Sequence, residues 1–479
     1  MSRPRILVLA PLGWSIRNNL RTEVAELMCE HAELTVATPA FAHPPLRADC
    51  ERRGIALVPL RAYPLGRWRS YALEVDRSTF FLGLGTVAAR VKWQRDLAVA
   101  RLRARLRRRA NHLLARLLRP VPDAAWRRFG RTCYAPPGGL FAEREMLDRV
   151  RPDLIFSTVP LANYYERPVL WLAEDRRIPV VTAITSWDNL SSKSRLPVRF
   201  QRTLVWGAHM RDELLRLYPD IAPESVVATG VPQFDLYRRA DVRPAREEFF
   251  SGIDAPADRP VVLYSGVPAS LMESEPRVLG QIARALSRGA VGPATLLYRP
   301  HPKAAPSWYR DTLASHPDIR CTPTNLEGDG NPALWSPGDA HVRTLCGSLL
   351  HSAVNLNFAS TMTLDACVLD LPVANLAFDD AGPQSPGSAL LRQMYAYDHY
   401  RPAVELGAAR VCDSLDQILA QLAEYIRNRA RDAEGRRRLV EMQCGAVDGR
   451  AAWRVARAVL EMLGIALPAP AVADRMAAQ

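Results

Sequence analysis

Short, almost wholly apolar runs alternate with helix-like stretches along most of this chain. Such runs lie at 5–12, 33–38, 54–60, 152–158, 179–185, 202–207 and 226–230, and again at 260–266, 294–300, 352–358 and 372–378. A strand that is apolar on both faces is typical of a parallel sheet with helices on either side. The sequence therefore predicts an α/β protein built from doubly wound parallel sheets.

The alternation breaks once, around 238–258, where the chain is charged and contains Pro and Gly. We therefore predict two Rossmann-like units, an N-terminal one at 1–240 and a C-terminal one at 255–450, followed by a helix and tail at 451–479. Ligands of such sheets bind beyond the carboxyl ends of the strands. With two facing units, we expect the site in the cleft between them.

Composition is that of a globular protein without a membrane-spanning segment. Hydrophobic residues make up 48% and charged residues 24% of the 479 residues, and no apolar run approaches the ~20 residues that cross a bilayer. The first apolar run ends at a Pro-Leu-Gly turn, so we expect a strand there rather than a signal peptide. The eight cysteines form no CxxC pair, which predicts reduced thiols. A cytoplasmic protein is expected.

Positive charge is concentrated in an insertion at 85–131 that interrupts the first unit. Between Arg90 and Arg131, 14 basic residues stand against two acidic ones, which accounts for nearly all of the net charge of +13. The core of the insertion, 93–119, lacks Gly and Pro and is predicted to be helical. Leucines lie among its arginines, at positions 97, 102, 106, 113, 114, 117 and 118.

This basic insertion has two main interpretations. A basic amphipathic helix can lie on an anionic membrane surface, here through 90–131. Alternatively, the helix packs its leucines on the domain and leaves its arginines in water. Nucleic acid is not expected as a partner, because no recognition module is present and no aromatic residues interleave with the basic run.

The second unit carries two polar loops at strand ends. Arg299, His301 and Lys303 follow the strand 294–300 directly, and a histidine flanked by cations suits a phosphate or diphosphate. Gly266 ends the preceding strand. After the strand 352–358, Ser360 and Thr361 begin a helix, where hydroxyls and backbone amides can cap the helix or bind an anion. Asp365, one turn further on, could accept hydrogen bonds from ribose hydroxyls. Two such loops favour a nucleotide.

The first unit contributes a polar loop after the strand 179–185. Asp188 is a candidate general base there, with Asn189 and Lys193 as neighbours. Trp187 could stack on a sugar or base, or could pack between the units. Gly13 and Trp14 follow the first strand of the chain and complete the candidate acceptor side. His399 is a further cleft candidate, and a packed surface turn is the alternative for it.

Several stretches carry a resemblance to a known superfamily. They are SWDNLSSK from 186, VWGAHMRDELLRLYPDIAPESVVATGVPQFD from 205, YRPHP from 298, NFASTMTLDACVLDLPVANLAFD from 357 and YDHYRPAVELGAARV from 397. With the order of elements, they resemble GT-B glycosyltransferases and the related nucleotide-sugar 2-epimerases. The HP and Ser-Thr pairs are also similar to motifs of CDP-glycerol glycerophosphotransferases and some bacterial sialyltransferases.

The resemblance implies roles for these residues. His301 would contact the donor phosphates, Ser360 and Thr361 would bind phosphate, and Asp365 would hold the ribose, where the family more often has Glu. It also implies a nucleotide-activated donor, no tightly bound cofactor and no metal.

The function expected is transfer of a sugar, or a polyol phosphate, to an envelope polysaccharide or a lipid-linked acceptor. The alternatives are a nucleotide-sugar 2-epimerase and a non-catalytic scaffold of the same fold. The enzyme would be cytoplasmic, or peripheral on the inner face of the plasma membrane.

Overall fold

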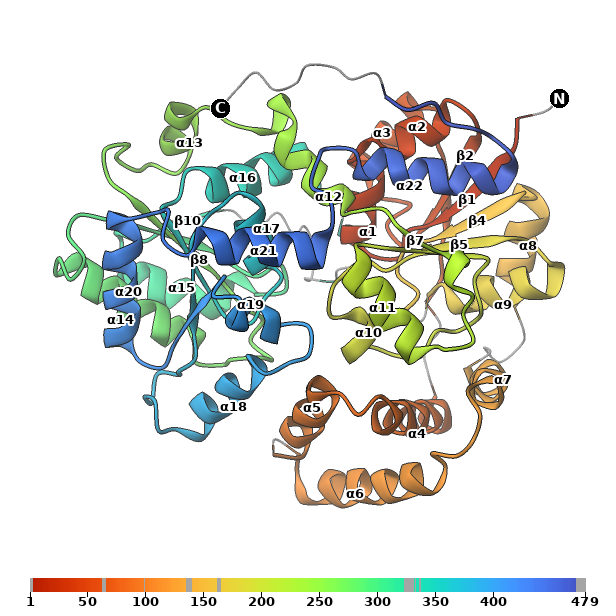
Figure 1. Cartoon of the computed structure of the whole chain (residues 1–479), viewed down its shortest axis with the longest axis horizontal. Helices are drawn as coiled ribbons and strands as arrows, with labels where there is room; N and C mark the ends of the chain where they lie inside the picture. The colour runs from red at the N-terminus through yellow and green to blue at the C-terminus, as the bar shows by residue number, and fades with distance from the viewer. Residues whose placement is uncertain are drawn as a thin grey trace.

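The computed structural model describes residues 3–62, 66–98, 100–134, 140–161, 165–322, 331, 333–335 and 337–470. Val99 of the predicted insertion and residues 471–479 of the predicted tail lie outside these ranges. Two sheets, parallel throughout, are flanked by helices (Figure 1), so the predicted α/β class is confirmed.

The first sheet has seven strands in the order β3-β2-β1-β4-β5-β6-β7. The strands are β1 (Arg5–Leu9), β2 (Glu33–Thr38), β3 (Ala56–Pro59), β4 (Leu154–Ser157), β5 (Val180–Ala183), β6 (Arg202–Val205) and β7 (Val226–Ala228). In register, Leu7 lies between Thr35 of β2 and Ile155 of β4. The strand order reverses direction between β1 and β4, so a crevice opens beyond the carboxyl ends of these two strands.

The second sheet has six strands in the order β10-β9-β8-β11-β12-β13. They are β8 (Val261–Ser265), β9 (Thr295–Arg299), β10 (Arg320–Cys321), β11 (Val354–Asn357), β12 (Val373–Leu376) and β13 (Arg410–Cys412). Here the order reverses between β8 and β11, and the predicted strand-end loops at 266, 299–303 and 360–365 follow β8, β9 and β11.

Helices cover both faces of each sheet (Figure 1). Around the first sheet lie α1 (Gly13–Leu20), α2 (Glu23–Cys29), α3 (Pro44–Arg52), α8 (Phe141–Val150), α9 (Arg167–Arg176), α10 (Asn189–Ser192), α11 (Ala208–Leu217) and α12 (Pro232–Asp235). Around the second lie α13 (Arg246–Gly252), α14 (Glu275–Ser287), α15 (Pro306–Ser315), α16 (Asp339–Leu350), α17 (Met362–Val368), α18 (Pro386–Met394), α19 (Arg401–Glu405), α20 (Leu415–Arg427) and α21 (Ala433–Cys444).

The chain then returns to the first sheet. Helix α22 (Ala451–Leu460) lies against α2 and α12 of the first unit (Figure 1). Val455, Val459 and Leu460 are buried in one apolar cluster with Ile6 and Val8 of β1. One face of the first core is therefore closed by residues from near the end of the chain.

Four helices form a separate layer between β3 and α8. They are α4 (Arg67–Leu84), α5 (Val87–Ala98), α6 (Leu102–Leu117) and α7 (Asp123–Tyr134). The stretch 93–119, expected to be helical, is interrupted between Ala98 and Leu102. The layer also begins earlier than the expected insertion, because α4 lies before residue 85. Gly85 caps the end of α4 with a left-handed φ of 63°.

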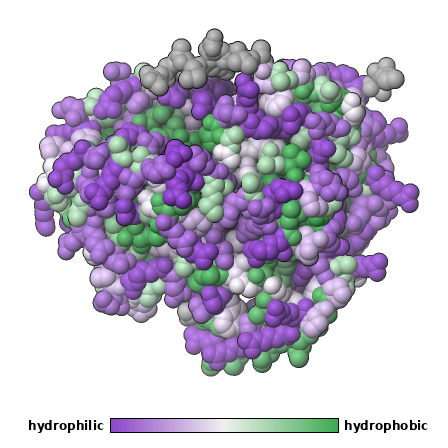
Figure 2. All heavy atoms as spheres, viewed as in Figure 1, coloured by the Kyte–Doolittle hydropathy of each residue, from purple (hydrophilic) through white to green (hydrophobic). Residues whose placement is uncertain are grey.

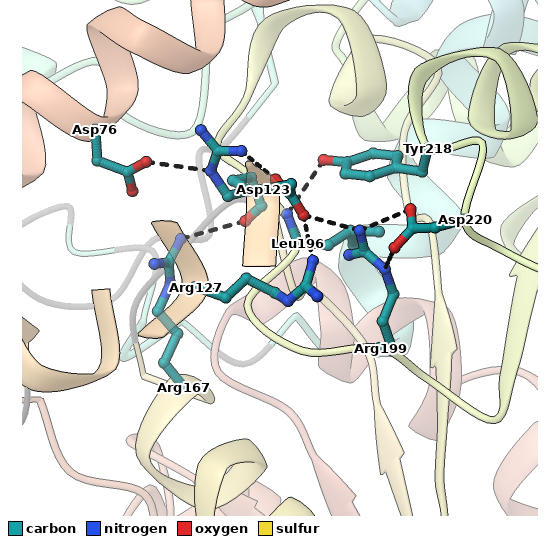
Figure 3. A network of polar contacts seen from close by, with 9 residues as sticks. Asp76, Asp123, Arg127, Arg167, Leu196, Arg199, Tyr218 and Asp220 are labelled. Atoms are coloured by element: carbon teal, nitrogen blue, oxygen red, sulfur yellow. Dashed lines mark hydrogen bonds and ion pairs between the residues drawn. The ribbon is translucent and has the colours of Figure 1, made fainter. Parts of the chain in front are cut away.

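A network of ion pairs fastens this layer to the first unit (Figure 3). Arg195, in the loop after α10, pairs with Asp76 of α4 at 3.2 Å and with Asp123 of α7. Arg199 bridges Asp123 and Asp220 at 2.8 Å each. The Arg195 guanidinium also lies 4.9 Å from the centre of the Phe80 ring. The Arg195–Asp76 pair is buried, and the Asp123 carboxylate is shared by Arg195 and Arg199, so these contacts hold α4 and α7 in one orientation.

A buried glutamate supports a strand-end loop in each unit. Glu166 accepts hydrogen bonds from Ser157 Oγ at 2.7 Å and from the backbone N–H groups of Thr158 and Val159, each at 3.1 Å. Glu275 accepts from the N–H of Val267 at 2.8 Å. Burial raises the pKa of Glu166 to about 7 and that of Glu275 to about 8.

Replacing Leu460 with Ala tests the role of α22. Leu460 is fully buried, so Leu460→Ala is expected to lower the free energy of unfolding by roughly 2–5 kcal/mol. Leu117→Ala removes the same atoms from a side chain that is 78% exposed. This variant should change the free energy of unfolding by less than about 0.5 kcal/mol. Urea denaturation measures both; equal effects would contradict this account of the core.

The raised pKa values predict a pH dependence of stability. The folded protein retains the Glu275 proton up to about pH 8, whereas an unfolded glutamate loses it near pH ~4.3. Between these two pH values the folded protein holds one more proton than the unfolded chain. The free energy of unfolding therefore falls as the pH rises from one value to the other. Glu275→Gln should flatten the decline of the urea midpoint between about pH 5 and 8. Glu247→Gln, at an exposed position, should leave the slope unchanged.

Candidate functional site

A cavity of about 400 Å³ lies between the two units at the carboxyl ends of their strands. Most of the residues predicted from sequence line it: Trp14, Asp188, Asn189, Lys193, Gly266, Arg299, His301, Lys303, Ser360, Thr361 and Asp365. Gly13 and Trp187 are not among its lining residues. The structure thus brings together loops that follow β1, β5, β8, β9 and β11.

Three cations of the cavity form no ion pair with the described residues, although the Asp365 carboxyl lies near two of them. Within the part of the chain that the structure describes, Arg17, Arg299 and Lys303 have no carboxylate at ion-pair distance. Burial lowers the pKa of Arg299 to about 10 and also lowers that of Lys303. Arg299 therefore still carries a positive charge at neutral pH, so this side of the cavity favours an anion.

His301 is held in one tautomer by its own loop. Its Nδ1 accepts a hydrogen bond from the backbone N–H of Lys303 at 3.0 Å, which leaves the proton on Nε2. Burial, together with the Lys303 ammonium, lowers the pKa of His301 to about 4. At neutral pH the residue is therefore an uncharged donor through Nε2 rather than an imidazolium.

Three groups approach Gly266 closely. A Cβ at this position would lie 3.1 Å from each of three atoms: Glu275 Oε1, the backbone nitrogen of His301 and the hydroxyl oxygen of Tyr298. The Gly266 N–H also donates to the Arg299 carbonyl at 2.8 Å. The loops after β8 and β9 are thus packed directly on each other, which fixes the His301 backbone.

The loop after β11 turns into α17. Ser360 Oγ accepts from the N–H of Met362 at 3.3 Å, so this hydroxyl is partly used in capping the helix. Asp365 is buried and accepts a hydrogen bond from the Tyr237 hydroxyl at 2.5 Å. Burial raises the pKa of Asp365, although Tyr237, Arg17 and Arg299 oppose the shift.

On the facing side, Asp188 forms an ion pair with Lys193 at 2.9 Å. Burial acts to raise the pKa of Asp188, but Lys193, His399 and the hydrogen bonds outweigh it, and the pKa lies well below its usual range. The group is therefore ionised at neutral pH. A carboxylate paired in this way is also a weaker proton acceptor than a free one.

Trp187 packs between the units rather than lining the cavity. It is 3% exposed, and its ring lies edge-on to those of His399 and Tyr400, with centroids 5.5 and 5.4 Å away. His399 Nδ1 lies 3.2 Å from Ser191 Oγ. Of the two interpretations of Trp187, the structure therefore shows the packing one, and His399 belongs to the same contact between the units.

Sequence reasoning missed several lining residues. Arg17 projects from α1 and donates to Gln233 Oε1 at 3.0 Å, and His341 from α16 lies 3.3 Å from Arg299. Both come from helices, so no strand-end loop marks them. The sequence did hold a hint for Arg17, because this residue lies only four positions after Gly13, which follows β1.

A buried row of amides lies beneath the cavity. Asn357 Nδ2 donates to Asn355 Oδ1 at 2.5 Å, Asn375 Nδ2 to Asn357 Oδ1 at 2.6 Å, and the Tyr400 hydroxyl to Asn375 Oδ1 at 2.7 Å. Asn355 also donates to Ser265 Oγ at 2.7 Å. This row crosses the sheet from β8 to β12 and ends at Tyr400, on which Trp187 packs. In the sequence this row is indicated by two asparagines, Asn355 and Asn357, within the otherwise apolar run SAVNLNF.

Comparison with known proteins shows the fold. No family model matches the chain, and no curated protein matches it. Among solved structures it is similar to S. aureus MnaA with UDP (TM-score 0.54, 12% identity, 96% of this chain and 97% of that one). It is also similar to the UDP-GlcNAc 2-epimerase of Neisseria meningitidis bound to UDP-GlcNAc (TM-score 0.51, 12% identity, 95% and 100%). The likeness spans both sheets, and the two-sheet GT-B-like architecture that the sequence resemblance implied is confirmed.

Proposed function

We propose that the protein is a glycosyltransferase that binds a nucleotide-activated sugar, or a polyol phosphate donor, on the second unit. The transferred group would pass to an acceptor held by the first unit. One observation carries the proposal: Arg17, Arg299 and Lys303 face a cavity at the strand ends with no carboxylate partner among the described residues.

A donor diphosphate would give these cations an anionic partner at hydrogen-bond distance. Charge-assisted hydrogen bonds to phosphate oxygens are about twice as strong as neutral ones. His301 adds a neutral Nε2–H donor beside these cations, and Ser360 and Thr361 add hydroxyls from the loop after β11. Asp365, whose carboxylate already accepts from Tyr237, is the proposed ribose contact.

In an inverting transfer, an acceptor hydroxyl oxygen bonds to the anomeric carbon as the bond from that carbon to the phosphate oxygen breaks. The electron pair of the broken bond stays on the leaving diphosphate, and Arg299 and Lys303 stabilise the charge that develops there. The hydroxyl proton passes to a base, for which Asp188 is our proposal. Its ion pair with Lys193 keeps it ionised and oriented.

The acceptor side is proposed to be Trp14, Asn189 and Lys193, with a saccharide or lipid-linked acceptor of an envelope polysaccharide; Gly13 is packed on Trp335 instead. Trp14 lines the cavity, and the Lys303 ammonium lies 5.9 Å from the centre of its ring. Asn189 Oδ1 is buried and has no hydrogen-bond partner among the residues that the structure describes, and we propose that it binds an acceptor hydroxyl.

A nucleotide-sugar 2-epimerase is the second candidate, supported by the solved structures of similar fold that carry this name. Such an enzyme inverts a ring carbon of the donor sugar and needs no acceptor. Incubation with UDP-GlcNAc alone separates the two: a new sugar-nucleotide epimer would favour this candidate, and product formation only with an added acceptor favours the transferase.

Nucleotide binding is the first measurement. CMP, CDP, UDP, GDP and dTDP are tested by thermal unfolding, and the matching one should raise the free energy of unfolding by about 2.7 kcal/mol at a hundredfold excess over Kd. His301→Ala should weaken the shift. His301→Gln, which restores an uncharged donor, should lose less.

Stabilisation by none of the five nucleotides would contradict the donor site and favour a non-catalytic scaffold. Equal losses in His301→Ala and His301→Gln would contradict the donor role of Nε2. Arg438→Ala, at an exposed position of α21, controls for charge removal far from the cavity and should keep the full shift.

Asp188→Asn tests the proposed base. The loss of a general base lowers kcat by about 10²–10⁴-fold, while the nucleotide-induced shift in Tm should persist, because the variant frees the Lys193 cation. Since the pKa of Asp188 is lowered, the wild-type rate should show no acid limb from this group between about pH 5.5 and 8. Unchanged kcat in the variant would remove Asp188 from the mechanism.

A further inference from the structure

The outer face of helix α6 combines exposed leucines with arginines. Leu102, Leu106, Leu113 and Leu117 are 69%, 56%, 61% and 78% exposed. Their spacing of four, seven and four residues places them on one side of the helix. The expectation that the insertion packs its leucines on the domain does not hold for these four; Leu97, Leu114 and Leu118 are the half-buried ones.

The opposite side of α6 carries the packing. Asn111 and Ala115 are 2% and 0% exposed, and α6 lies against α4. In Figure 1, α6 is the outermost helix of the layer, with α4 between it and the first sheet. Figure 2 shows hydrophobic residues next to hydrophilic ones along the same lower edge of the molecule. The leucines therefore face away from the protein.

Arginines flank this stripe. Arg101, Arg103, Arg109, Arg116 and Arg119 are exposed, and none has a carboxylate at ion-pair distance among the residues that the structure describes. Arg107 differs, because it pairs with Glu74 of α4 at 3.4 Å. Charges that lack partners within the protein are available to an external anionic surface.

We infer that the leucine-arginine face of α6 docks on an anionic lipid bilayer. The leucines would enter the boundary between headgroups and acyl chains, and the arginines would meet lipid phosphates. A bilayer suits both halves of the pattern, because it offers negative charge and an apolar interior at the same surface. A nucleic acid would match the arginines and leave four leucines in water. No helix of the described residues is long and apolar enough to span the membrane, so contact would be through this face.

The ion-pair network of Arg195 and Arg199 fixes the direction of approach. It joins α4 and α7 to the loop after α10, and Asp188 and Lys193 of the cleft lie at the two ends of α10. Thr86 Oγ1 at the start of α5 also donates to the Ser191 carbonyl at 2.9 Å. A bilayer bound to α6 would thus hold the acceptor side of the cleft in a set orientation.

The full-length protein is sedimented with vesicles of phosphatidylcholine containing phosphatidylglycerol, and with phosphatidylcholine alone, without nucleotide. We expect binding to the anionic vesicles only, and weaker binding at high salt. The double variant Leu113→Glu/Leu117→Glu should lose binding by roughly tenfold or more, as should Arg103→Glu/Arg109→Glu.

Matched controls separate this face from general charge. Arg288→Glu/Arg438→Glu makes the same charge change on exposed residues of the second unit, and Phe141→Glu alters a side chain of α8 that is 78% exposed. Both should bind as the wild type does, and all variants should keep its Tm. Wild-type protein that stays in the supernatant would overturn the proposal. So would leucine variants that bind fully, or retention on RNA instead of vesicles.

The inference stands apart from the proposed function. Vesicle binding is measured without donor or acceptor, so a failure to bind nucleotide leaves it intact. Conversely, loss of vesicle binding leaves the cavity and its cations unaffected.

Discussion

Parallel strand pairing is the constraint on which the rest of the structure depends. Parallel strands are buried on both faces, so helices must cover both sides and every carboxyl end points to the same edge. The two sheets turn these edges toward each other, and the cavity lies between them. Polar groups buried there must find partners, which explains the row from Ser265 through Asn355, Asn357 and Asn375 to Tyr400.

The sequence was most informative where local pattern and sheet geometry coincide. Apolar runs revealed the strands, and the polar residues that follow them, such as His301 and Asp188, lie in one cavity because strand ends meet. Contacts between distant segments were not readable in this way. Arg17 reaches the site from a helix, and for Trp187 the sequence left stacking on a ligand and packing between the units as alternatives, which only its contact with Tyr400 distinguishes. The position of the His301 proton likewise depends on a hydrogen bond from Lys303, which composition cannot reveal.

The protein has two cationic regions with different physical properties. In the cavity, Arg299 and Lys303 are partly desolvated, so their fields act over short distances with little screening by salt. On α6 the arginines are in water, and their attraction for an anionic surface weakens as salt increases. One region is suited to holding a small anion in a defined position, and the other to contacting an extended surface.

The return of the chain through α22 connects the two units a second time. The backbone passes between them twice, through 236–246 and through 445–450, and both passages lie beside α12 and the start of α22, which contact each other. At the second passage Gly445 is packed on Trp206, where a Cβ would lie 3.0 Å from the carbonyl oxygen. The units are therefore joined by two covalent strands that lie side by side. Trp187 joins them again through its ring contacts with His399 and Tyr400, so the walls of the cleft are held by covalent crossings and by buried aromatic packing together.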